Sequence, residues 1–399
     1  MIGDYVGFSI GSRAYGNIHI GNHVLVVPNS VVIKDVPDNC VVSGEPAKII
    51  KQQRKMKIVL DPRNRIRYSA YYILGIEKLF GEKSVKFDMK PFTGLTRFRE
   101  EHSFEQYMAF IIYDMDINRK YVIDFRDTED ISEMAYKWCD VYAKINISKE
   151  TNMEEYPKMI SIPPGFGIRI YSTVKIFYLC LLNLIKCRFK PLRGLYLHFI
   201  DYWSMYKYQL PISEYDSSSF DNDIICVFHA STLWSHKFCM SETNPLRLTF
   251  MEACKNNSNI QFEGGFFIKG EVPQRYKEFS FTSWIPRKDY LYKTKNSMFV
   301  FNTPAVHKCH GWKLGEYLAM AKVIITTPIS NKLPSPLVNG ENVIVVRNEV
   351  EMRDAIEVLA GDVKLREKIS KNNREYYLKY VEPASVIKAM ITKAQNNSK

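Results

Sequence analysis

The sequence has no closely spaced cysteine pairs, no long apolar run and no complete glycine-rich fingerprint. Its eight cysteines form no CxxC pair, which argues against a disulfide framework or a zinc site and predicts reduced, mostly buried thiols. No apolar run reaches the roughly 18–20 residues that a membrane-spanning helix needs. The N-terminus lacks the order of regions found in a signal peptide, so we expect a cytoplasmic protein. Gly165-Phe166-Gly167 lacks the third glycine of a dinucleotide fingerprint and is typical of a turn.

The composition is that of a basic, aromatic-rich globular protein. The 399 residues are 46% hydrophobic, which is enough for the cores of two or three domains. The net charge of +12 favours an anionic partner: the phosphates of a nucleotide, anionic lipid headgroups or nucleic acid. We expect no nucleic-acid partner, because no nucleic-acid-binding motif accompanies the charge.

Residues 1–55 carry a repeat with a period of six. Apolar residues recur at this spacing, with Ile-Gly pairs at 2–3, 10–11 and 20–21 and Asp, Asn and Ser between them. A hexapeptide period predicts a β-helix, in which one inward apolar residue recurs on each side of a triangular coil.

The following segment, VVIKDVPDNCVVSGEPAKIIK (31–51), resembles the closing segment of serine-acetyltransferase-like hexapeptide enzymes. The resemblance implies a short left-handed β-helix fragment and an oligomer built on residues 1–55. That family's catalytic histidine lies in earlier coils, and His19 and His23 do not match its position. We therefore expect an oligomerising or relict segment, with acetyl-CoA-dependent O-acetyl transfer as the disfavoured alternative.

Strands and helices alternate over the rest of the chain, which predicts parallel α/β domains. Residues 56–212 form a first Rossmann-like domain, with strands at 58–60, 107–116 and 120–128 and a helix near 130–143. The polar stretch 213–225 is the predicted linker. Residues 226–399 form a second domain that ends in helices. Two such domains bracket a cleft, where ligands normally bind.

Residues 168–210 differ from their surroundings. They contain seven Lys or Arg against one acid, Asp201, so they hold half of the net charge, and ten aromatic residues are interleaved. The apolar core 176–185 is too short to span a bilayer. This pattern fits a surface that lies on an anionic membrane. A core helix with a solvated basic edge is the equally weighted alternative.

The stretch 300–329 carries the clearest chemistry. A strand leads into the loop TPAVHKCHG (303–311) and then into a helix that opens at Trp312 and Lys313. Helix N-termini bind diphosphates through free N–H groups, and Lys313 adds a cation there. Glu316, one turn later, can accept hydrogen bonds from a ribose diol.

These residues resemble the donor-site segment of GT-B glycosyltransferases, particularly exostosin-like and family-4-like enzymes. The matching segments are GWKLGEYLAMAKVIITTPI (311–329), PSPLVNGENVIVV (334–346) and KISKNNREYYLKYVEP (368–383). The resemblance implies a GT-B fold with two Rossmann-like domains facing a cleft. It also implies that Glu316 contacts the nucleotide ribose, that Arg247 binds the diphosphate, and that the loop with His310 and Gly311 faces the sugar and phosphates.

One position departs from the family pattern. Retaining members carry a glutamate eight residues before the ribose glutamate, but Lys308 stands there, so the stereochemical outcome is open. His307 or His310 would then face the sugar. The cluster around Cys309 could instead be read as metal ligands, but no matching fourth ligand accompanies it, so we expect no metal site.

Carboxylates at two strand ends are candidates for chemistry. Asp124 and Asp127, in YVIDFRDT, could act as general base toward an acceptor hydroxyl. Structural capping or a pairing with Arg126 is an alternative of at least equal weight. Asp114 and Asp116 match the DxD pattern of GT-A enzymes at low specificity. Trp312 could stack on the base, although packing is the default interpretation.

Together these features predict a cytoplasmic glycosyltransferase at the inner face of the cell membrane. It would move a sugar from a nucleotide sugar, UDP- or GDP-linked, to a hydroxyl of a surface glycan or lipid-linked acceptor, with no required cofactor. Two alternatives stay open: the O-acetyltransferase, and a non-catalytic membrane-surface or oligomerising protein.

Overall fold

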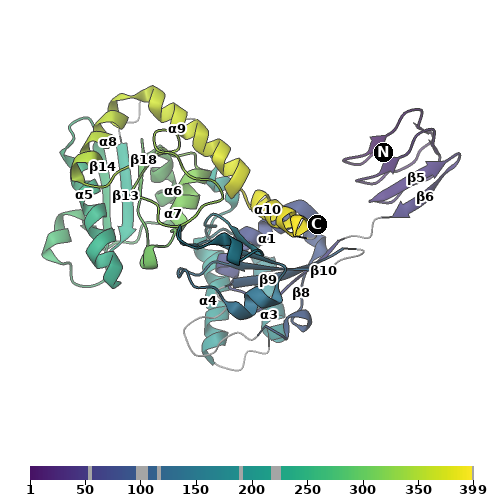
Figure 1. Cartoon of the computed structure of the whole chain (residues 1–399), viewed down its shortest axis with the longest axis horizontal. Coiled ribbons are helices and arrows are strands. Elements are labelled where there is room, and N and C mark those ends of the chain that lie inside the picture. Colours follow the sequence, from purple (N-terminus) through teal and green to yellow (C-terminus); the bar gives the residue numbers. More distant parts are fainter. Residues whose placement is uncertain (53–55, 96–106, 115–117, 188–191, 217–225, 398–399) are drawn as a thin grey trace. The chain divides into compact units, whose positions relative to one another are not determined.

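The computed structural model describes residues 1–52, 56–95, 107–114, 118–187, 192–216 and 226–397. The chain divides into two compact units (Figure 1). The first contains Met1–Ile58 with Ile112–Asn118, and the second contains Val59–Ile111 with Arg119–Lys399. Of the predicted linker 213–225, residues 217–225 lie outside the described residues.

The first unit is a short β-coil closed by a hairpin. Its strands are β1 (Gly7–Phe8), β2 (Arg13–Ala14), β3 (Leu25–Val26), β4 (Val31–Val32), β5 (Cys40–Gly44) and β6 (Ala47–Gln52). They form one sheet in the order β1-β3-β5-β6 and another made of β2 and β4. All pairings are parallel except the closing β5–β6 hairpin.

The register of the ladders matches the period of six in the first coil, while the second coil is two residues shorter. Gly7 pairs with Leu25, and Leu25 pairs with Val41, so successive coils take 18 and 16 residues. Three hexapeptides make an 18-residue coil with three sides. The inward residues form a small core of Ile20, Val24, Val26, Val32, Val36, Cys40 and Val42. The predicted β-helix fragment is therefore present.

The first α/β sheet of the second unit has the order β12-β11-β10-β9-β7-β8. Its strands are β7 (Lys57–Leu60), β8 (Val85–Phe87), β9 (Tyr107–Tyr113), β10 (Asn118–Asp124), β11 (Val141–Lys144) and β12 (Met159–Ser161). Strands β10, β11 and β12 run parallel. The accompanying helices are α1 (Ile66–Phe80), α2 (Glu133–Trp138), α3 (Thr173–Cys187) and α4 (Leu192–Tyr208).

The predicted helix near 130–143 is wrong at its C-terminal end. Helix α2 stops at Trp138, and after two further residues the segment VYAK (141–144) is the buried strand β11. A four-residue apolar run cannot be assigned to helix or strand by periodicity alone, and here parallel pairing with β10 decides it.

The second α/β sheet region consists of two parallel sheets, β13-β14-β15 and β16-β17-β18. Its strands are β13 (Cys226–Thr232), β14 (Gln261–Phe267), β15 (Ser280–Phe281), β16 (Val300–Asn302), β17 (Ile324–Thr326) and β18 (Val343–Val345). The backbone N–H of Met298 donates to Cys226 O at 2.8 Å, which joins the two sheets along β13 and β16. Helices α5 (Asn244–Asn256), α6 (Arg287–Asn296), α7 (Trp312–Ala319) and α8 (Glu349–Gly361) cover them. Their shared core includes the buried residues Val227, Phe250, Phe266, Phe301 and Ile325.

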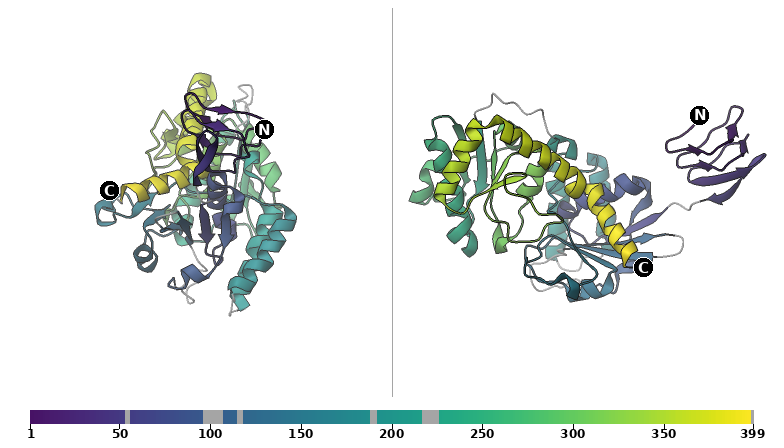
Figure 2. Two further views of the ribbon diagram at one scale, coloured as in Figure 1. Left: turned by 90° about the vertical axis from the view of Figure 1, so that its right-hand side faces the viewer. Right: turned by 45° about the horizontal axis from the view of Figure 1, so that its top comes forward.

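The C-terminal helices α9 (Val363–Tyr376) and α10 (Pro383–Asn396) return from the second sheet region to the first (Figures 1 and 2). Helix α10 packs on α1 so closely that a Cβ on Gly75 would lie 2.2 Å from Pro383 O. The Tyr71 hydroxyl donates to Val381 O at 2.7 Å and secures the same junction. This return joins the two α/β regions into one body.

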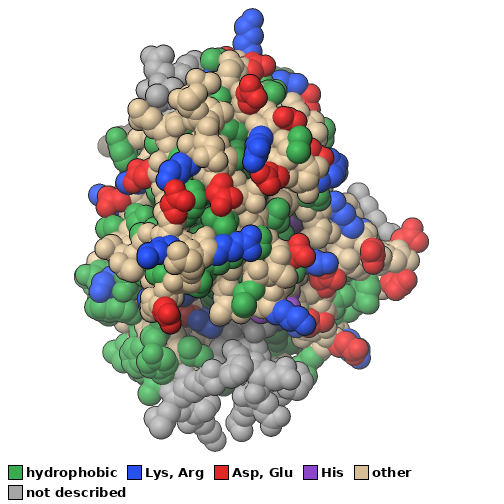
Figure 3. All heavy atoms as spheres, turned by 90° about the vertical axis from the view of Figure 1, so that its left-hand side faces the viewer, with side chains coloured by type: hydrophobic (Ala, Val, Ile, Leu, Met, Phe, Trp, Pro, Cys, Tyr) green, Lys and Arg blue, Asp and Glu red, His purple; other side chains and the backbone are tan. Residues whose placement is uncertain are grey.

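The predicted fold class is confirmed: parallel α/β sheets in two regions, preceded by a β-helix fragment. All eight cysteines lie in the described residues, form no disulfide and are buried, except the partly buried Cys226. In the described part of the chain, no helix is long and apolar enough to cross a membrane. On the face drawn in Figure 3, basic and acidic side chains are interspersed, so the net positive charge is not gathered there.

Candidate functional site

A cavity of about 460 Å³ lies where β13 and β16 end and where α6 and α7 begin. Ligands of open α/β sheets bind at the carboxyl ends of the strands, and this cavity follows that rule. Most of its walls come from the second sheet region. Arg67, Tyr68 and Asp127 of the first region complete it, so both α/β regions of the second unit face one cleft.

The start of α7 forms one wall. Gly311 is the N-cap, in an extended conformation, and Trp312 and Lys313 form the first turn. The loop before it contains His307 with a positive φ of 55°. A Cβ on Gly311 would meet only the Ala305 side chain at 3.8 Å, so the helix start opens toward the cavity.

Lys313 reaches across the wall to the end of β13. Its Nζ donates to Ala230 O at 2.6 Å. Burial lowers the pKa of Lys313 to about 7, and repulsion from Arg247 adds to this effect although Glu316 opposes it. The ammonium therefore titrates near neutrality in the absence of an anion.

Glu316 lies one turn further into α7 and is 2% exposed. One carboxylate oxygen, Oε1, forms an ion pair with the Nη2 group of Arg287 at the start of α6. The same Arg287 group also donates to the Tyr215 hydroxyl at 3.0 Å. The other oxygen, Glu316 Oε2, is buried and has no hydrogen-bond partner among the described residues. One carboxylate oxygen is thus ion-paired, and the other has no hydrogen-bond partner among the described residues.

Arg247 of α5 likewise has one side-chain nitrogen that is hydrogen-bonded and another that is not. It is 6% exposed, and its Nε donates to Thr303 Oγ1 at 3.0 Å. Its Nη1 is buried without a partner within the described residues. Burial lowers the pKa of Arg247 to about 10, which still leaves the guanidinium charged at pH 7. The buried Ser231 Oγ, at the end of β13, is likewise unpartnered in the part of the chain described.

Five buried polar atoms on the cavity wall have no hydrogen-bond partner among the described residues: Arg247 Nη1, Ser231 Oγ, Glu316 Oε2, Tyr290 Oη and His310 Nε2. A buried polar group without a hydrogen bond costs about 1–3 kcal/mol each. Folded proteins satisfy nearly all such groups, so several together on one wall indicate the place of a ligand. Arg247 Nη1 can donate, Glu316 Oε2 accepts, and the Ser231 and Tyr290 hydroxyls can do either, which fits a ligand with an anionic part and a hydroxyl part.

Asp127 of the first sheet region lines the cavity beside Cys309 and is exposed. Partial desolvation raises its pKa, while a hydrogen bond from Cys309 Sγ at 3.6 Å and the nearby His307 act in the opposite direction. A carboxylate with a raised pKa is suited to accept a proton. His307 is exposed beside the cavity, with its ring 4.9 Å from that of His236, and it is not part of the wall.

His310 lines the cavity from the same loop. Its backbone N–H donates to Asn146 Oδ1 at 2.9 Å, which fixes the loop to the first sheet region. Burial lowers the pKa of His310 to about 4, so the imidazole is neutral at pH 7.

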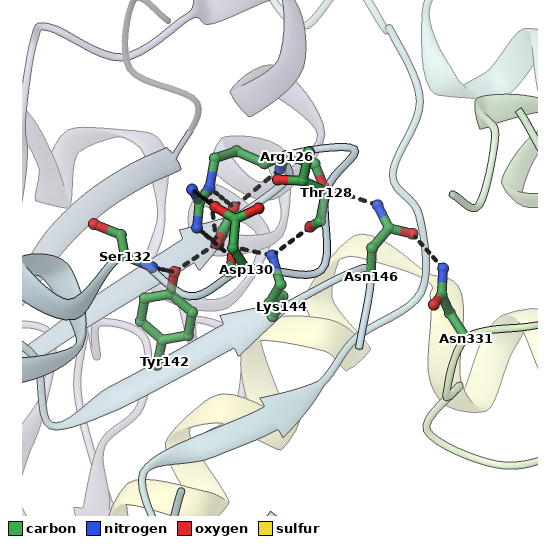
Figure 4. A network of polar contacts seen from close by, with 9 residues as sticks. Arg126, Thr128, Asp130, Ser132, Tyr142, Lys144, Asn146 and Asn331 are labelled. Carbon is green, nitrogen blue, oxygen red and sulfur yellow. Dashed lines mark hydrogen bonds and ion pairs between the residues drawn. The ribbon is translucent and has the colours of Figure 1, made fainter. Parts of the chain in front are cut away.

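Asp124 is placed differently from Asp127. It is fully buried at the end of β10 and accepts hydrogen bonds from Arg126, Lys144 and Tyr142 (Figure 4). Burial alone would raise the pKa of Asp124, but the charges of Lys144 and Arg126 outweigh it and hold the pKa below its usual value. The geometry thus favours the alternative interpretation, a structural pairing with Arg126, over a general base.

The other predicted ligands are distributed as follows. Asp114 is exposed at the end of β9, and Asp116 lies outside the described residues. Trp312 lines the cavity, but its ring packs edge-on against Tyr68 at 5.2 Å, with the Arg67 guanidinium 5.6 Å from its centroid. This favours packing over base stacking. Within the described ranges, no group of three or more His, Cys, Asp or Glu side chains is arranged to hold a metal ion.

Sequence reasoning missed three cavity residues: Ser231, Arg287 and Trp284. Trp284 is exposed and stands over Phe267 in an edge-on contact at 5.4 Å, which makes an aromatic rim. Arg287 could have been suspected, because it follows Pro286 at a helix start. Its pairing with Glu316, 29 residues away, carried no signal in the sequence.

Comparison with known proteins gives matches at both ends of the chain. Residues 247–392 match a family model described as glycosyl transferase-like. This confirms the predicted resemblance for the region that contains Arg247, Lys313 and Glu316. A structure titled as a glycosyltransferase from Rickettsia africae ESF-5 is 12% identical, covers 68% of each chain and has a TM-score of 0.35. A likeness at that level supports no argument by itself.

The N-terminal matches are to acetyltransferases. A serine acetyltransferase of Staphylococcus epidermidis is 42% identical over 64 residues, which are 16% of this chain and 30% of the relative. A maltose O-acetyltransferase from Clostridium difficile 630 is 41% identical over 13% of this chain and 27% of that chain, with a TM-score of 0.13. The chain thus spans less than a third of the length of these relatives, and the match supports only the predicted hexapeptide-repeat resemblance.

Proposed function

We propose that this protein is a glycosyltransferase that uses a nucleotide sugar bound in the cleft at the start of α7. Residues 226–399 would bind the donor, and the first region, 56–212, would face the acceptor. The observation that carries the proposal is the group of buried cavity atoms without a partner among the described residues, in particular Arg247 Nη1, Ser231 Oγ and Glu316 Oε2. The match of residues 247–392 to glycosyl transferase-like proteins supports it from an independent direction.

The anionic half of the wall suits a diphosphate. Arg247 Nη1 and Ser231 Oγ would each donate to a phosphate oxygen, and Lys313 would add a positive charge together with the N-terminus of α7. When a diphosphate binds, the pKa of Lys313 rises because the anion favours the ammonium. A cavity of about 460 Å³ is within the range of small-molecule sites.

The hydroxyl-binding half of the wall suits a ribose. Glu316 Oε2 is an acceptor whose position is fixed, because Arg287 holds the other oxygen. A carboxylate oxygen in this setting would accept a hydrogen bond from the ribose 2′- or 3′-hydroxyl. Trp284, at the aromatic rim, would offer a face for the base. UDP- and GDP-linked sugars both meet these requirements.

In the reaction, an acceptor hydroxyl would attack the anomeric carbon of the donor. The new C–O bond forms as the bond between that carbon and the diphosphate breaks, and the diphosphate leaves with the electron pair. Asp127, with its raised pKa, would take the hydroxyl proton. Arg247, Lys313 and the α7 N-terminus would stabilise the charge on the leaving diphosphate. The rate gain would come from positioning and charge stabilisation.

The acceptor would be a hydroxyl of a surface glycan or a lipid-linked sugar. The β-helix fragment, residues 1–55, would serve as an oligomerising segment. Neither assignment is needed for donor binding, and each can be tested apart from it.

Thermal shift with a panel of UDP-, GDP- and dTDP-linked sugars tests the proposal. We expect one nucleotide class to stabilise the wild type and Glu357→Ala, because Glu357 is exposed on α8, outside the cavity. Glu316→Ala should lose the stabilisation. If every donor leaves the melting temperature unchanged while acetyl-CoA raises it, the protein is an acetyltransferase and the proposal is wrong.

A further inference from the structure

We propose that the hairpin of α3 and α4 is a docking surface for an anionic lipid bilayer, with its apolar side chains seated among the acyl chains. This inference goes beyond donor binding and does not depend on it. It rests on the side chains that the two helices expose, on the groove between them and on the charges around it.

Helix α3 turns an apolar face to solvent. Phe177, Leu181 and Ile185 follow each other at intervals of four residues and are 48%, 59% and 67% exposed. Residues four apart lie on one side of a helix, so these side chains form a continuous stripe. Val174 and Tyr178, also exposed, widen it.

Helix α4 adds a second stripe beside the first. Tyr196, Phe199 and Trp203 are 63%, 46% and 47% exposed. A groove of about 840 Å³ runs between the stripes, and its lining is apolar or aromatic throughout: Phe177, Cys180, Leu181, Leu195, Tyr196, Phe199, Ile200, Tyr202 and Trp203. Soluble monomers rarely expose so continuous an apolar surface without a binding role.

The polar contacts that hold the hairpin together lie on its inner side, although the Phe177 ring also packs against the Tyr206 ring at 5.6 Å. On its inner side, Asn183 Nδ2 donates to the Tyr202 hydroxyl at 2.9 Å, and His198 Nε2 donates to Cys180 O at 2.8 Å. Asp201 forms an ion pair with Arg65, which fastens α4 to α1. Packing and polar contacts therefore fix the hairpin from within, while the outer stripes are left to another partner.

The charges around the groove identify that partner. Within the sequences of α3 and α4, Asp201 is the sole acidic residue, and it is 2% exposed and paired. Lys207 is exposed, and Lys186 is partly exposed although its Nζ donates to Phe87 O at 2.6 Å, whereas Lys175 is ion-paired with Glu82. The outward face of the hairpin is thus apolar at its centre, with the charge of Lys207 and Lys186 at its margin. Anionic headgroups complement this arrangement.

Two further features favour a bilayer over a protein partner. Protein interfaces are depleted in lysine, whereas helices that lie on membranes combine lysine with Trp, Tyr and Leu. The two helices have 15 and 17 residues, or roughly 22–26 Å at 1.5 Å per residue, which is shorter than the hydrocarbon core of a bilayer. They fit a position along the membrane surface, with the stripes immersed and the lysines among headgroups.

Vesicle co-sedimentation of the full chain, without nucleotide, tests the inference. We expect binding to phosphatidylcholine vesicles that contain phosphatidylglycerol, and weaker binding to phosphatidylcholine alone. The triple variant Phe177→Ser, Leu181→Ser, Trp203→Ser should lose at least roughly tenfold in affinity for each side chain. Lys207→Gln should lose roughly fivefold on the anionic vesicles.

The matched control replaces three exposed apolar residues elsewhere: Val350→Ser, Val358→Ser, Leu378→Ser. It should bind vesicles like the wild type, and all variants should keep the wild-type melting temperature. Quenching of tryptophan fluorescence by brominated lipid should disappear in Trp203→Phe, which keeps an apolar side chain.

Absence of vesicle binding by the wild type, or equal binding by the stripe and control variants, would overturn the inference. A wild-type dimer that becomes a monomer in the stripe variant would also overturn it, because the face would then be a contact between two copies. Donor binding, measured by thermal shift, is independent of each of these results.

Discussion

The buried ammonium of Lys313 should make donor binding depend on pH. Burial lowers its pKa to about 7 in the free protein, but a bound diphosphate would keep the lysine charged. Above pH 7, therefore, the protein must take up a proton as it binds the donor. The diphosphate of a nucleotide sugar is esterified at both ends and does not titrate in this range, so the lysine is the group that responds.

The size of the effect follows from the protonated fraction. With a pKa of about 7, roughly 90% of Lys313 is charged at pH 6 and roughly 3% at pH 8.5. Donor affinity should then fall about 30-fold between these values, equivalent to roughly 2 kcal/mol. Arg247, with a pKa of about 10, stays charged throughout and contributes no such dependence.

Isothermal titration calorimetry with the donor that gives the largest thermal shift measures this directly. We expect the Kd of the wild type to rise by about tenfold per pH unit above pH 7.5. Lys313→Arg should bind with a nearly constant Kd, because arginine remains charged, and Lys313→Met should bind weakly at every pH. A wild-type Kd that does not change between pH 6 and 8.5 would refute the assignment of Lys313 to the diphosphate.

Four further predictions concern stability and chemistry. Asp124→Asn should lower the free energy of unfolding by about 3–5 kcal/mol in urea titrations, because it leaves a buried lysine uncompensated. Asp127→Asn should keep wild-type stability and donor affinity but reduce turnover at least roughly 100-fold. Equal stability losses in Asp124→Asn and Asp127→Asn would contradict the different roles of the two carboxylates. Gly315→Ala should lower the free energy of unfolding by about 1–3 kcal/mol, because the added Cβ would lie 2.4 Å from Pro164 O. An unchanged melting temperature would mean that α7 can shift to make room for the methyl group. Burial lowers the pKa of Lys322 to about 7, so between pH 7 and its usual value of 10.5 the unfolded chain holds a proton that the folded chain does not. Lys322 should therefore make stability rise with pH by up to about 1.4 kcal/mol per unit, and Lys322→Met should remove that share of the slope while the share from Lys313, whose pKa is also about 7, remains.

The features that local pattern encodes could be predicted. The period of six in residues 1–55 specifies the coil, because each turn repeats the same inward apolar position. The loop–helix pattern predicts helix α7. It also predicts the positions of Lys313 and Glu316, because both lie near the start of that helix. Arg247 was placed by resemblance, and the cavity does include it.

The features that depend on tertiary pairing could not be predicted. The contact of Glu316 with Arg287 joins α7 to α6, and only the folded sheet brings these helix starts together. The strand β11 was read as part of a helix, since its pairing with β10 is set by the sheet and not by its four residues. Asp124 and Asp127 look equivalent in YVIDFRDT. Their burial separates them, since one is enclosed by Lys144 and Arg126 and the other lines the cavity.

The direct test of the donor site is discrimination of ribose by Glu316. Calorimetry would compare a nucleoside diphosphate with its 2′,3′-dideoxy counterpart on the wild type, Glu316→Gln and the exposed control Glu357→Gln. A hydrogen bond to a charged acceptor is worth about 1.5–3 kcal/mol, so the wild type and control should prefer the ribonucleotide by roughly 10- to 150-fold. Glu316→Gln should lose most of this preference while still binding the dideoxynucleotide. If the preference is the same in all three proteins, Glu316 does not contact the ribose, and the cleft does not hold a nucleotide sugar in the proposed way.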